Sequence, residues 1–288
     1  MAARLPIVLP ALVALVCTSP ARATYSIAGV DESTGEVGGA GASCVGSSGV
    51  ARIYGSAPGI AVVLAQADSS PELRDEAARR LMLGESPSTL LVAITDPAFD
   101  RNAAARQYGV VSLSQGPFGF TGSETLGFAD DLQGRTGTFA YSVQGNILTG
   151  ESVLGRSRDA FESDACDLPE RLMRALEAGG VDGEGDRRCA PAVPADAAFI
   201  QVDRPGEPAG SYLFLEVRNT GSDDPVALLR NRFDAWRATH PCPELPDAGV
   251  AMDAGAESDR DSGCAASPGG GFGSLVIALL LWRRASRA

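Results

Sequence analysis

The sequence contains no lysine, and it has a single histidine, His240, among its 288 residues. All 24 basic residues are arginine. These absences exclude a Schiff-base lysine, the lysine of a phosphate-binding loop, a Ser-Lys dyad and any zinc site that needs two histidines. A high-GC genome would produce the same bias without a functional cause, but the exclusions hold either way. We interpret His240, which precedes Pro241 at the edge of an acidic segment, as a solvated surface residue rather than a base.

Positive charge is also scarce. The 36 acidic residues outnumber the arginines and give a formal net charge of -12. The arginines are scattered among carboxylates, whereas phosphate neutralisation needs clustered cations, so we expect no nucleic-acid partner. The hydrophobic share of 44% is typical of a packed globular domain.

The N-terminus has the order of a secretory signal peptide over residues 1–23. Arg4 is followed by an apolar run at 7–16 and then by the small-residue tripeptide that ends at Ala23. The apolar run is too short, with Pro10 inside it, to span a hydrocarbon core of ~30 Å. We therefore expect signal peptidase to cut after Ala23 and to leave Thr24 as the first residue.

The C-terminus suggests a second processing signal. Residues 243–263 are acidic and rich in Ala, Gly and Pro, which predicts a disordered linker. Residues 264–288 then place Cys264, a glycine-rich step, an apolar run and three arginines in an order that resembles the MYXO-CTERM surface-sorting signal. That resemblance implies processing at Cys264 by a C-terminal sorting protease. A plain tail anchor is the alternative, and in either case the membrane is contacted only through this segment.

Cysteine usage agrees with export. Cys17 falls in the signal peptide and Cys264 in the sorting signal, so four cysteines remain in the domain. They permit two disulfides in three connectivities. Because Cys166 precedes a predicted helix and Cys189 follows the loop after it, we favour that pair, which leaves Cys44 with Cys242. A zinc site is the alternative, but no C-x-x-C spacing occurs.

Residues 24–242 are expected to form one domain with no internal repeat. Ser-Pro pairs at Ser70 and Ser86 predict helix starts, and Gly84 predicts the end of the first helix. The expected strands are 25–30, 36–44, 59–65, 107–113, 118–122, 138–144, 197–202 and 211–217, and the expected helices are 71–83, 87–94, 151–162, 168–178 and 225–239. Groups of strands alternating with helix pairs suggest helices on both sides of a mostly antiparallel two-sheet stack, an α+β fold.

The sequence offers few groups that could do chemistry. No G-x-S-x-G elbow occurs, and Cys44 has no nearby histidine. No carboxylate cluster has metal-ligand spacing, and the glycines at 39 and 41 lack the third glycine of a dinucleotide loop, so we expect no metal and no cofactor. A free N-terminal Thr24 would carry both a hydroxyl nucleophile and an amine base of pKa ~7.7–8.0. The alternative is that any signal cleavage exposes some small polar residue.

Several strings resemble the bacterial family called domain of unknown function 1028. They are 24–27, the turn at 31–36, Gln66-Ala67, Thr121-Gly122, 172–180, 185–188 and above all 141–148, YSVQGNIL. The resemblance covers residues 24–202 and, more loosely, the last helix. It implies a four-layer αββα sandwich similar to N-terminal nucleophile (Ntn) hydrolases, in which Thr24 is the nucleophile and amides are cleaved. Many Ntn hydrolases place a lysine near the nucleophile, and this chain has none.

Further roles follow as hypotheses. Asn146, with the Gly145 backbone on a tight turn, is the candidate oxyanion donor. Ser43 and Gln66 would orient the Thr24 amine or the substrate, and Asp186 with Arg187 would bind a charged end of it. Each has a structural alternative: Asn146 as a turn cap, Ser43 and Gln66 as partners of buried backbone groups, and Asp186-Arg187 as a surface ion pair.

The sequence thus predicts an exported, surface-tethered or released amidohydrolase that acts on a small-molecule or peptide amide, cell-wall fragments included. The alternative is a non-catalytic surface module that keeps the sandwich for binding.

Overall fold

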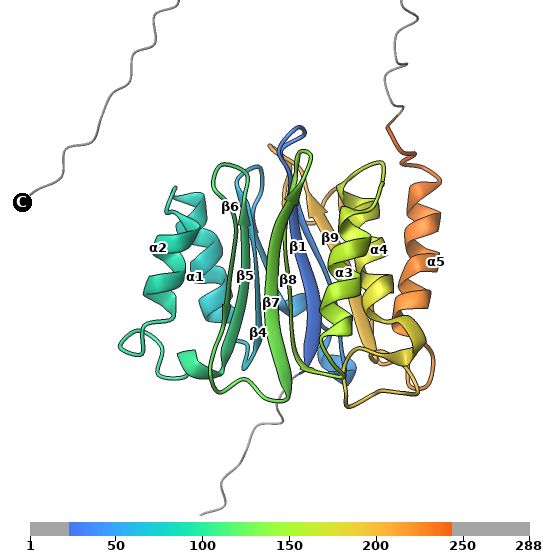
Figure 1. The fold of residues 1–288 in the computed structure, drawn as a ribbon. Helices are drawn as coiled ribbons and strands as arrows, with labels where there is room; N and C mark the ends of the chain where they lie inside the picture. The colour runs from blue at the N-terminus through green and yellow to red at the C-terminus, as the bar shows by residue number, and fades with distance from the viewer. Residues whose placement is uncertain (1–22, 244–288) are drawn as a thin grey trace, which may run out of the picture. The chain divides into compact units, whose positions relative to one another are not determined.

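A computed structural model describes residues 23–243, in which two antiparallel sheets pack face to face and helices cover both outer faces (Figure 1). The predicted signal segment up to residue 22, the linker from 244 and Cys264 lie outside these residues. The strands are β1 Thr24–Asp31, β2 Glu36–Ser43, β3 Tyr54–Ala57, β4 Ala61–Ala67, β5 Arg106–Ser112, β6 Gly116–Thr121, β7 Phe128–Thr136, β8 Phe139–Leu148, β9 Ala197–Asp203 and β10 Leu213–Val217. The α-helices are α1 Pro71–Met82, α2 Pro87–Ile94, α3 Ser152–Glu162, α4 Leu168–Gly179 and α5 Pro225–Arg237, and short 3-10 helices occupy Gly46–Ser48, Ala51–Ile53, Ala103–Ala105 and Val181–Gly183.

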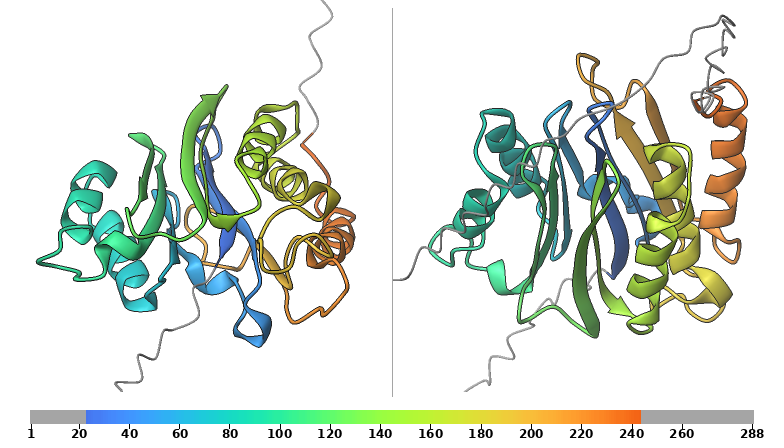
Figure 2. Two further views of the ribbon diagram at one scale, coloured as in Figure 1. Left: turned by 60° about the horizontal axis from the view of Figure 1, so that its bottom comes forward. Right: turned by 45° about the horizontal axis from the view of Figure 1, so that its top comes forward.

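The larger sheet has the order β10-β9-β2-β1-β8-β7, and the smaller one has the order β3-β4-β5-β6. Strand β1 is central, with β2 on one side and β8 on the other. Helices α1 and α2 pack on the smaller sheet, and α3, α4 and α5 pack on the larger sheet (Figure 2). The four-layer α+β sandwich expected from the sequence is confirmed.

Three apolar clusters separate the four layers. Alternate residues of β1 divide between two of them, since Tyr25 and Ile27 pack toward α3–α5 while Ala28 and Val30 pack between the sheets. A third cluster, with Leu81, Leu90 and Val110, lies under α1 and α2. Every residue of β1 is therefore buried, and Thr24 and Ser26 share the face that looks into the space between the sheets.

Helix starts follow the predicted capping. The Ser70 hydroxyl accepts from the Leu73 backbone N–H at 3.2 Å, and the Ser86 hydroxyl accepts from that of Thr89 at 3.1 Å. Two strands were missed, β3 and β7, and each lies at the edge of its sheet. Strand β3 is only four residues long, and β7 is mostly half-exposed, so neither has the buried alternation that marks a strand in sequence.

Gly109 in β5 permits a close approach between the sheets. A Cβ there would lie 2.1 Å from the Gln144 side-chain oxygen, which is buried and hydrogen-bonded. We expect Gly109→Ala to lower the free energy of unfolding by about 1–3 kcal/mol through overpacking. Gly155 in α3 has no atom within 4 Å of such a Cβ, so Gly155→Ala should raise it by about 1 kcal/mol. Urea unfolding of the two variants measures whether the free energy of unfolding falls in the first and rises in the second. Equal changes in both variants would contradict this account of packing.

The disulfide pairing expected from the sequence is wrong. The structure joins Cys44 to Cys189 and Cys166 to Cys242, with Cα–Cα distances of 6.2 and 5.7 Å. Cys166 lies before α4, and Cys189 lies beyond its far end. The 12 residues of α4 span about 18 Å, and the loop that follows is held at the far end, where Asp186 accepts from the Cys44 backbone N–H.

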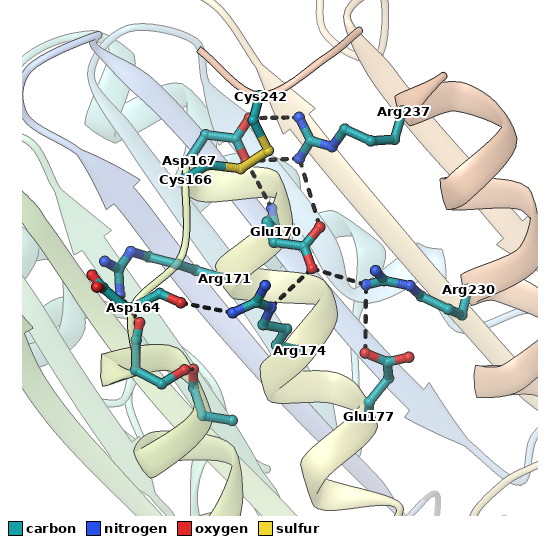
Figure 3. Close-up of polar contacts among 12 residues, drawn as sticks. Asp164, Cys166, Asp167, Glu170, Arg171, Arg174, Glu177, Arg230, Arg237 and Cys242 are labelled. Atoms are coloured by element: carbon teal, nitrogen blue, oxygen red, sulfur yellow. Dashed lines mark hydrogen bonds and ion pairs between the residues drawn. A yellow bond between two sulfur atoms is a disulfide. The ribbon is translucent and has the colours of Figure 1, made fainter. Parts of the chain in front are cut away.

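The Cys166–Cys242 bridge is part of a larger clasp between α4 and α5 (Figure 3). Arg237 donates to both Asp167 carboxylate oxygens at 2.7 Å. Arg230 donates to Glu170 at 3.1 Å, and Arg174 donates to the same carboxylate at 2.9 Å. Covalent and ionic contacts thus fix the end of α5 to the start of α4.

Replacing Cys166 and Cys242 together by alanine should lower the free energy of unfolding by about 2–4 kcal/mol, because the bridge restricts the unfolded chain. The ion pairs of the clasp should keep α5 docked, so we expect the circular dichroism spectrum at 25 °C to be unchanged. Guanidinium unfolding measures the loss, and an unchanged midpoint would contradict it.

No helix among residues 23–243 combines the length and apolar character needed to cross a membrane.

Candidate active site

Thr24 begins β1 at the end of the sandwich and is 2% exposed. Its register partner in β8 is Asn146, so the two side chains lie side by side on the same face of the sheet. On the other side, the Thr24 hydroxyl donates to the Ser43 hydroxyl at 3.2 Å. The sheet therefore brings together Thr24 and two more of the residues singled out in the sequence, Asn146 and Ser43.

The carbonyl that precedes Thr24 is held by two donors. The Ser43 hydroxyl donates to the Ala23 carbonyl oxygen, and the Arg188 guanidinium donates to it from Nη2 at 3.2 Å. Ala23 itself is fully buried. The bond expected to be cut during export thus lies inside a cluster of polar side chains.

Asp186 fixes Arg188 in place. Its carboxylate is fully buried and pairs with the Arg188 guanidinium at 2.6 Å. It also accepts from the backbone N–H of Cys44 at 2.7 Å and from that of Arg188 at 3.0 Å. The Cys44–Cys189 bridge joins the same two segments, so a disulfide and an ion pair together hold the loop after α4 against Thr24.

A chain of buried amides runs from Thr24 into the space between the sheets. The Gln66 side-chain N–H donates to the Thr24 carbonyl at 3.4 Å and to Gln107 at 2.8 Å. Ser26 donates to the Gln66 oxygen at 2.5 Å and accepts from Gln144 at 2.7 Å. Gln107 in turn donates to the Gly145 carbonyl at 2.9 Å. These bonds satisfy the buried groups and fix the first residues of β1.

A small depression lies beside Thr24, with a cavity volume of about 10 Å³, which is room for about one water molecule. Its lining includes the polar residues Gln66, Arg52 and Ser69 and the apolar residues Val45, Val50 and Ile53. A substrate group larger than a water molecule would need further space at this site, such as that released by removal of Ala23.

Tyr25 follows Thr24 but points to the opposite face of the sheet. Burial, together with the carboxylates of Asp224 and Asp186, raises the pKa of Tyr25 far above its usual range. Its hydroxyl donates to the Leu176 carbonyl at 3.3 Å. Tyr25 therefore stays protonated at neutral pH and cannot act as a base beside Thr24.

Two expectations about this site need correction. Gly145 and Asn146 lie within β8, not on a tight turn, because β8 continues to Leu148 and pairs with β1 along its length. Asp186 does not form a surface ion pair with Arg187, since Asp186 is buried and its partner is Arg188, while Arg187 is exposed. Arg187 and Arg188 lie in the turn after Asp186, and the spacing of residues does not say which of the two side chains turns back toward that carboxylate.

The structure also adds residues that the sequence did not suggest. Ser26, Gln107, Gln144 and Arg188 all contact the cluster around Thr24. The available signal was three glutamines at positions 66, 107 and 144 inside otherwise apolar strands, where a buried amide must find partners. His240 is exposed and stacks on Trp236 at 4.5 Å between ring centroids, as a surface residue would.

Among residues 23–243, no group of three or more His, Cys, Asp or Glu side chains could hold a metal ion.

Comparison with known proteins places this chain in a family. A search of curated proteins finds no match. Among solved structures, this chain is similar to the crystal structure of protein SPO2555 from Silicibacter pomeroyi, with a TM-score of 0.62 and 24% identity. The description of that structure gives the family model DUF1028. The match covers 75% of this chain and 89% of that one, and it shows a shared fold. The family model for the family of unknown function DUF1028 matches residues 24–229, and the chain belongs to that family.

Proposed function

We propose that this protein is an exported amidohydrolase of the Ntn type, with Thr24 as nucleophile after cleavage of the Ala23–Thr24 bond. The observation that carries the proposal is that the Ala23 carbonyl and the Thr24 hydroxyl meet at one buried polar cluster. The substrate is a small-molecule or peptide amide, which includes cell-wall fragments.

The cut would create the missing base. In the uncut chain the Thr24 nitrogen is a peptide nitrogen and cannot take a proton. After cleavage it becomes an amine on the same residue as the hydroxyl, close enough to accept the hydroxyl proton directly or through one water. No lysine or histidine is then required, which fits a chain without lysine.

The reaction would proceed in two halves. The Thr24 hydroxyl oxygen attacks the amide carbon, and its proton passes to the amine. The amine returns that proton to the leaving nitrogen, the C–N bond breaks, and an ester on Thr24 remains. Water, activated by the same amine, then hydrolyses the ester to release the acid and restore Thr24.

Removal of Ala23 would also free an oxygen site. The Ser43 hydroxyl and the Arg188 guanidinium now hold the Ala23 carbonyl oxygen, and both would be available to a substrate carbonyl beside Thr24. Asn146, next to Thr24 in the ladder, remains the candidate for a further donor. Donors fixed before the charge develops are the kind that stabilise an oxyanion, at about 2.7–4 kcal/mol for one donor.

Export and surface tethering belong to the same proposal. Two disulfides favour an oxidising compartment. Ala23 and Thr24 are buried in the folded domain, so we expect cleavage to precede folding, as it does during translocation. Tethering would then depend on Cys264 and the segment around it.

Arg188 offers a test of the base. A positive charge beside the new amine lowers its pKa, and the amine must be neutral to accept a proton. In Arg188→Gln, Asp186 loses its cation, so the amine pKa should rise. We expect the ascending limb of kcat/KM against pH, measured on an amide that the enzyme cleaves, to move to higher pH.

Arg187→Gln is the matched control, because it removes the same charge one residue away while the contact to the Ala23 carbonyl is made by Arg188. Its profile should coincide with that of the parent enzyme. A profile for Arg188→Gln that is scaled down without any shift would assign Arg188 to oxygen binding alone. Unchanged activity in Arg188→Gln would remove it from the site.

A further inference from the structure

A second and larger pocket lies far from Thr24. It is an open depression with a cavity volume of about 360 Å³, formed by β3, α1, the end of β9 and the loop after β9. Asp203 at its base pairs with Val37 in β2, whereas Ser43 beside Thr24 is six residues further along β2. Six strand residues span about 20 Å, so the two pockets lie toward opposite ends of the sandwich.

A buried carboxylate underlies this pocket. Asp203 is fully buried, and three residues that line the pocket donate to it. The Tyr54 and Ser56 hydroxyls donate at 2.7 and 2.6 Å, and the Gln201 amide donates at 3.1 Å. The Gly210 backbone N–H donates at 2.5 Å. A buried charge is costly without a counterion, yet no ion pair of Asp203 occurs within the described part of the chain.

The Asp203 carboxylate fixes the direction in which the hydroxyl and amide groups of the pocket wall donate hydrogen bonds. A hydroxyl has one hydrogen, and Tyr54 and Ser56 both direct theirs to Asp203. Burial and the adjacent carboxylate also raise the pKa of Tyr54, so it keeps that hydrogen. Gln201 turns its N–H group to Asp203, which leaves its carbonyl oxygen for other partners. Apart from the Arg79 guanidinium, the polar side chains that line the pocket can therefore accept hydrogen bonds from a ligand.

The charges on the rim are already matched. Asp75 pairs with Arg74 at 2.7 Å, and Arg79 pairs with Glu76 at 2.8 Å. Asp203, by contrast, has four hydrogen-bond donors but no ion pair among residues 23–243. The rest of the lining includes the short or flexible apolar side chains of Ala78, Met82 and Ala209.

We propose that this pocket binds an alkylammonium group, with the ammonium against the acceptors of Ser56, Tyr54 and Gln201 and the alkyl stem against Ala78, Met82 and Ala209. An ammonium has three donors and no acceptor, which complements this wall. The positive charge of the ammonium would interact with Asp203 across the Tyr54, Ser56 and Gln201 side chains that separate them. The group could belong to a free amine or to a lysine side chain. This proposal is independent of any role for Thr24.

The test is a calorimetric titration of the full-length protein with butylammonium chloride. A parallel titration with 1-butanol, which has the same butyl chain and no charge, is the neutral comparison. Butylammonium should bind saturably, and butanol should bind at least about tenfold more weakly. Asp203→Asn and Ser56→Ala should each weaken butylammonium binding, the former by about tenfold. Ser56→Ala also covers the case in which the Asp203 variant fails to fold.

Arg79→Gln should change the affinity for butylammonium in the opposite direction. Loss of this exposed cation should tighten butylammonium binding by up to about fivefold, whereas Arg158→Gln on α3 makes the same change in net charge and should have no effect. Competition by a lysine-containing pentapeptide against free butylammonium distinguishes a side-chain ligand from a free amine. Equal binding of butanol and butylammonium, or unchanged affinity in both Asp203→Asn and Ser56→Ala, would overturn the proposal.

Discussion

Thr24→Ala is expected to reduce amide hydrolysis by the exported protein by at least about 10⁴-fold, because it removes the only atom that can form the acyl intermediate. Stability should change little. The Thr24 hydroxyl makes one long hydrogen bond, to Ser43 at 3.2 Å, and alanine leaves β1 and its ladder in place. A panel of chromogenic amides followed under steady-state conditions measures the loss.

Thr24→Ser is the matched variant, since serine keeps both a hydroxyl and the N-terminal amine. It should retain measurable turnover and should accumulate the same ester, visible as a mass increase after quenching in acid. Equal activity in the alanine and parent proteins would assign hydrolysis, if any occurs, to another site.

Asp186→Ala is expected to have the largest effect on stability, with a loss of about 3–5 kcal/mol in the free energy of unfolding. Asp186 is fully buried, and its removal takes away the carboxylate that pairs with Arg188 and the acceptor of the Cys44 N–H. Activity should fall as well, because Asp186 holds Arg188 against the site. Guanidinium unfolding and the amide assay report the two effects separately.

Glu184→Gln is the control in the same loop. Glu184 pairs with Arg156 at 2.6 Å, but both side chains are more than a third exposed, so the loss should stay below about 1 kcal/mol. Two equal losses in the free energy of unfolding would mean that burial does not distinguish these two ion pairs.

The layers of this fold could be predicted from the sequence because their signals are local. Ser-Pro caps and apolar periodicity located all five α-helices, with ends within about two residues. The strands β3 and β7 could not be found in this way, since one is short and the other half-exposed at a sheet edge. These two strands form by pairing at the edges of the sheets, and local residue patterns do not reveal such pairing.

The site shows the same division. Thr24 could be singled out because the predicted signal peptide ends just before it, and Ser43, Gln66, Asn146 and Asp186 lie around it. The choice of Arg188 over Arg187 depends on which way a loop residue turns. The disulfide partners depend on where the loop after α4 is held, which is beside Cys44 and not beside Cys166. Neither is encoded in the spacing of residues along the chain.

The account depends on the identity of the first residue, which intact-mass and N-terminal sequencing of the exported protein measure directly. We predict a chain that begins at Thr24 with a free amine, reactive toward amine-labelling reagents at neutral pH. A chain that begins elsewhere, or that carries a blocked Thr24, would have no base at this site and would contradict the proposed hydrolase, leaving a binding module on the same scaffold.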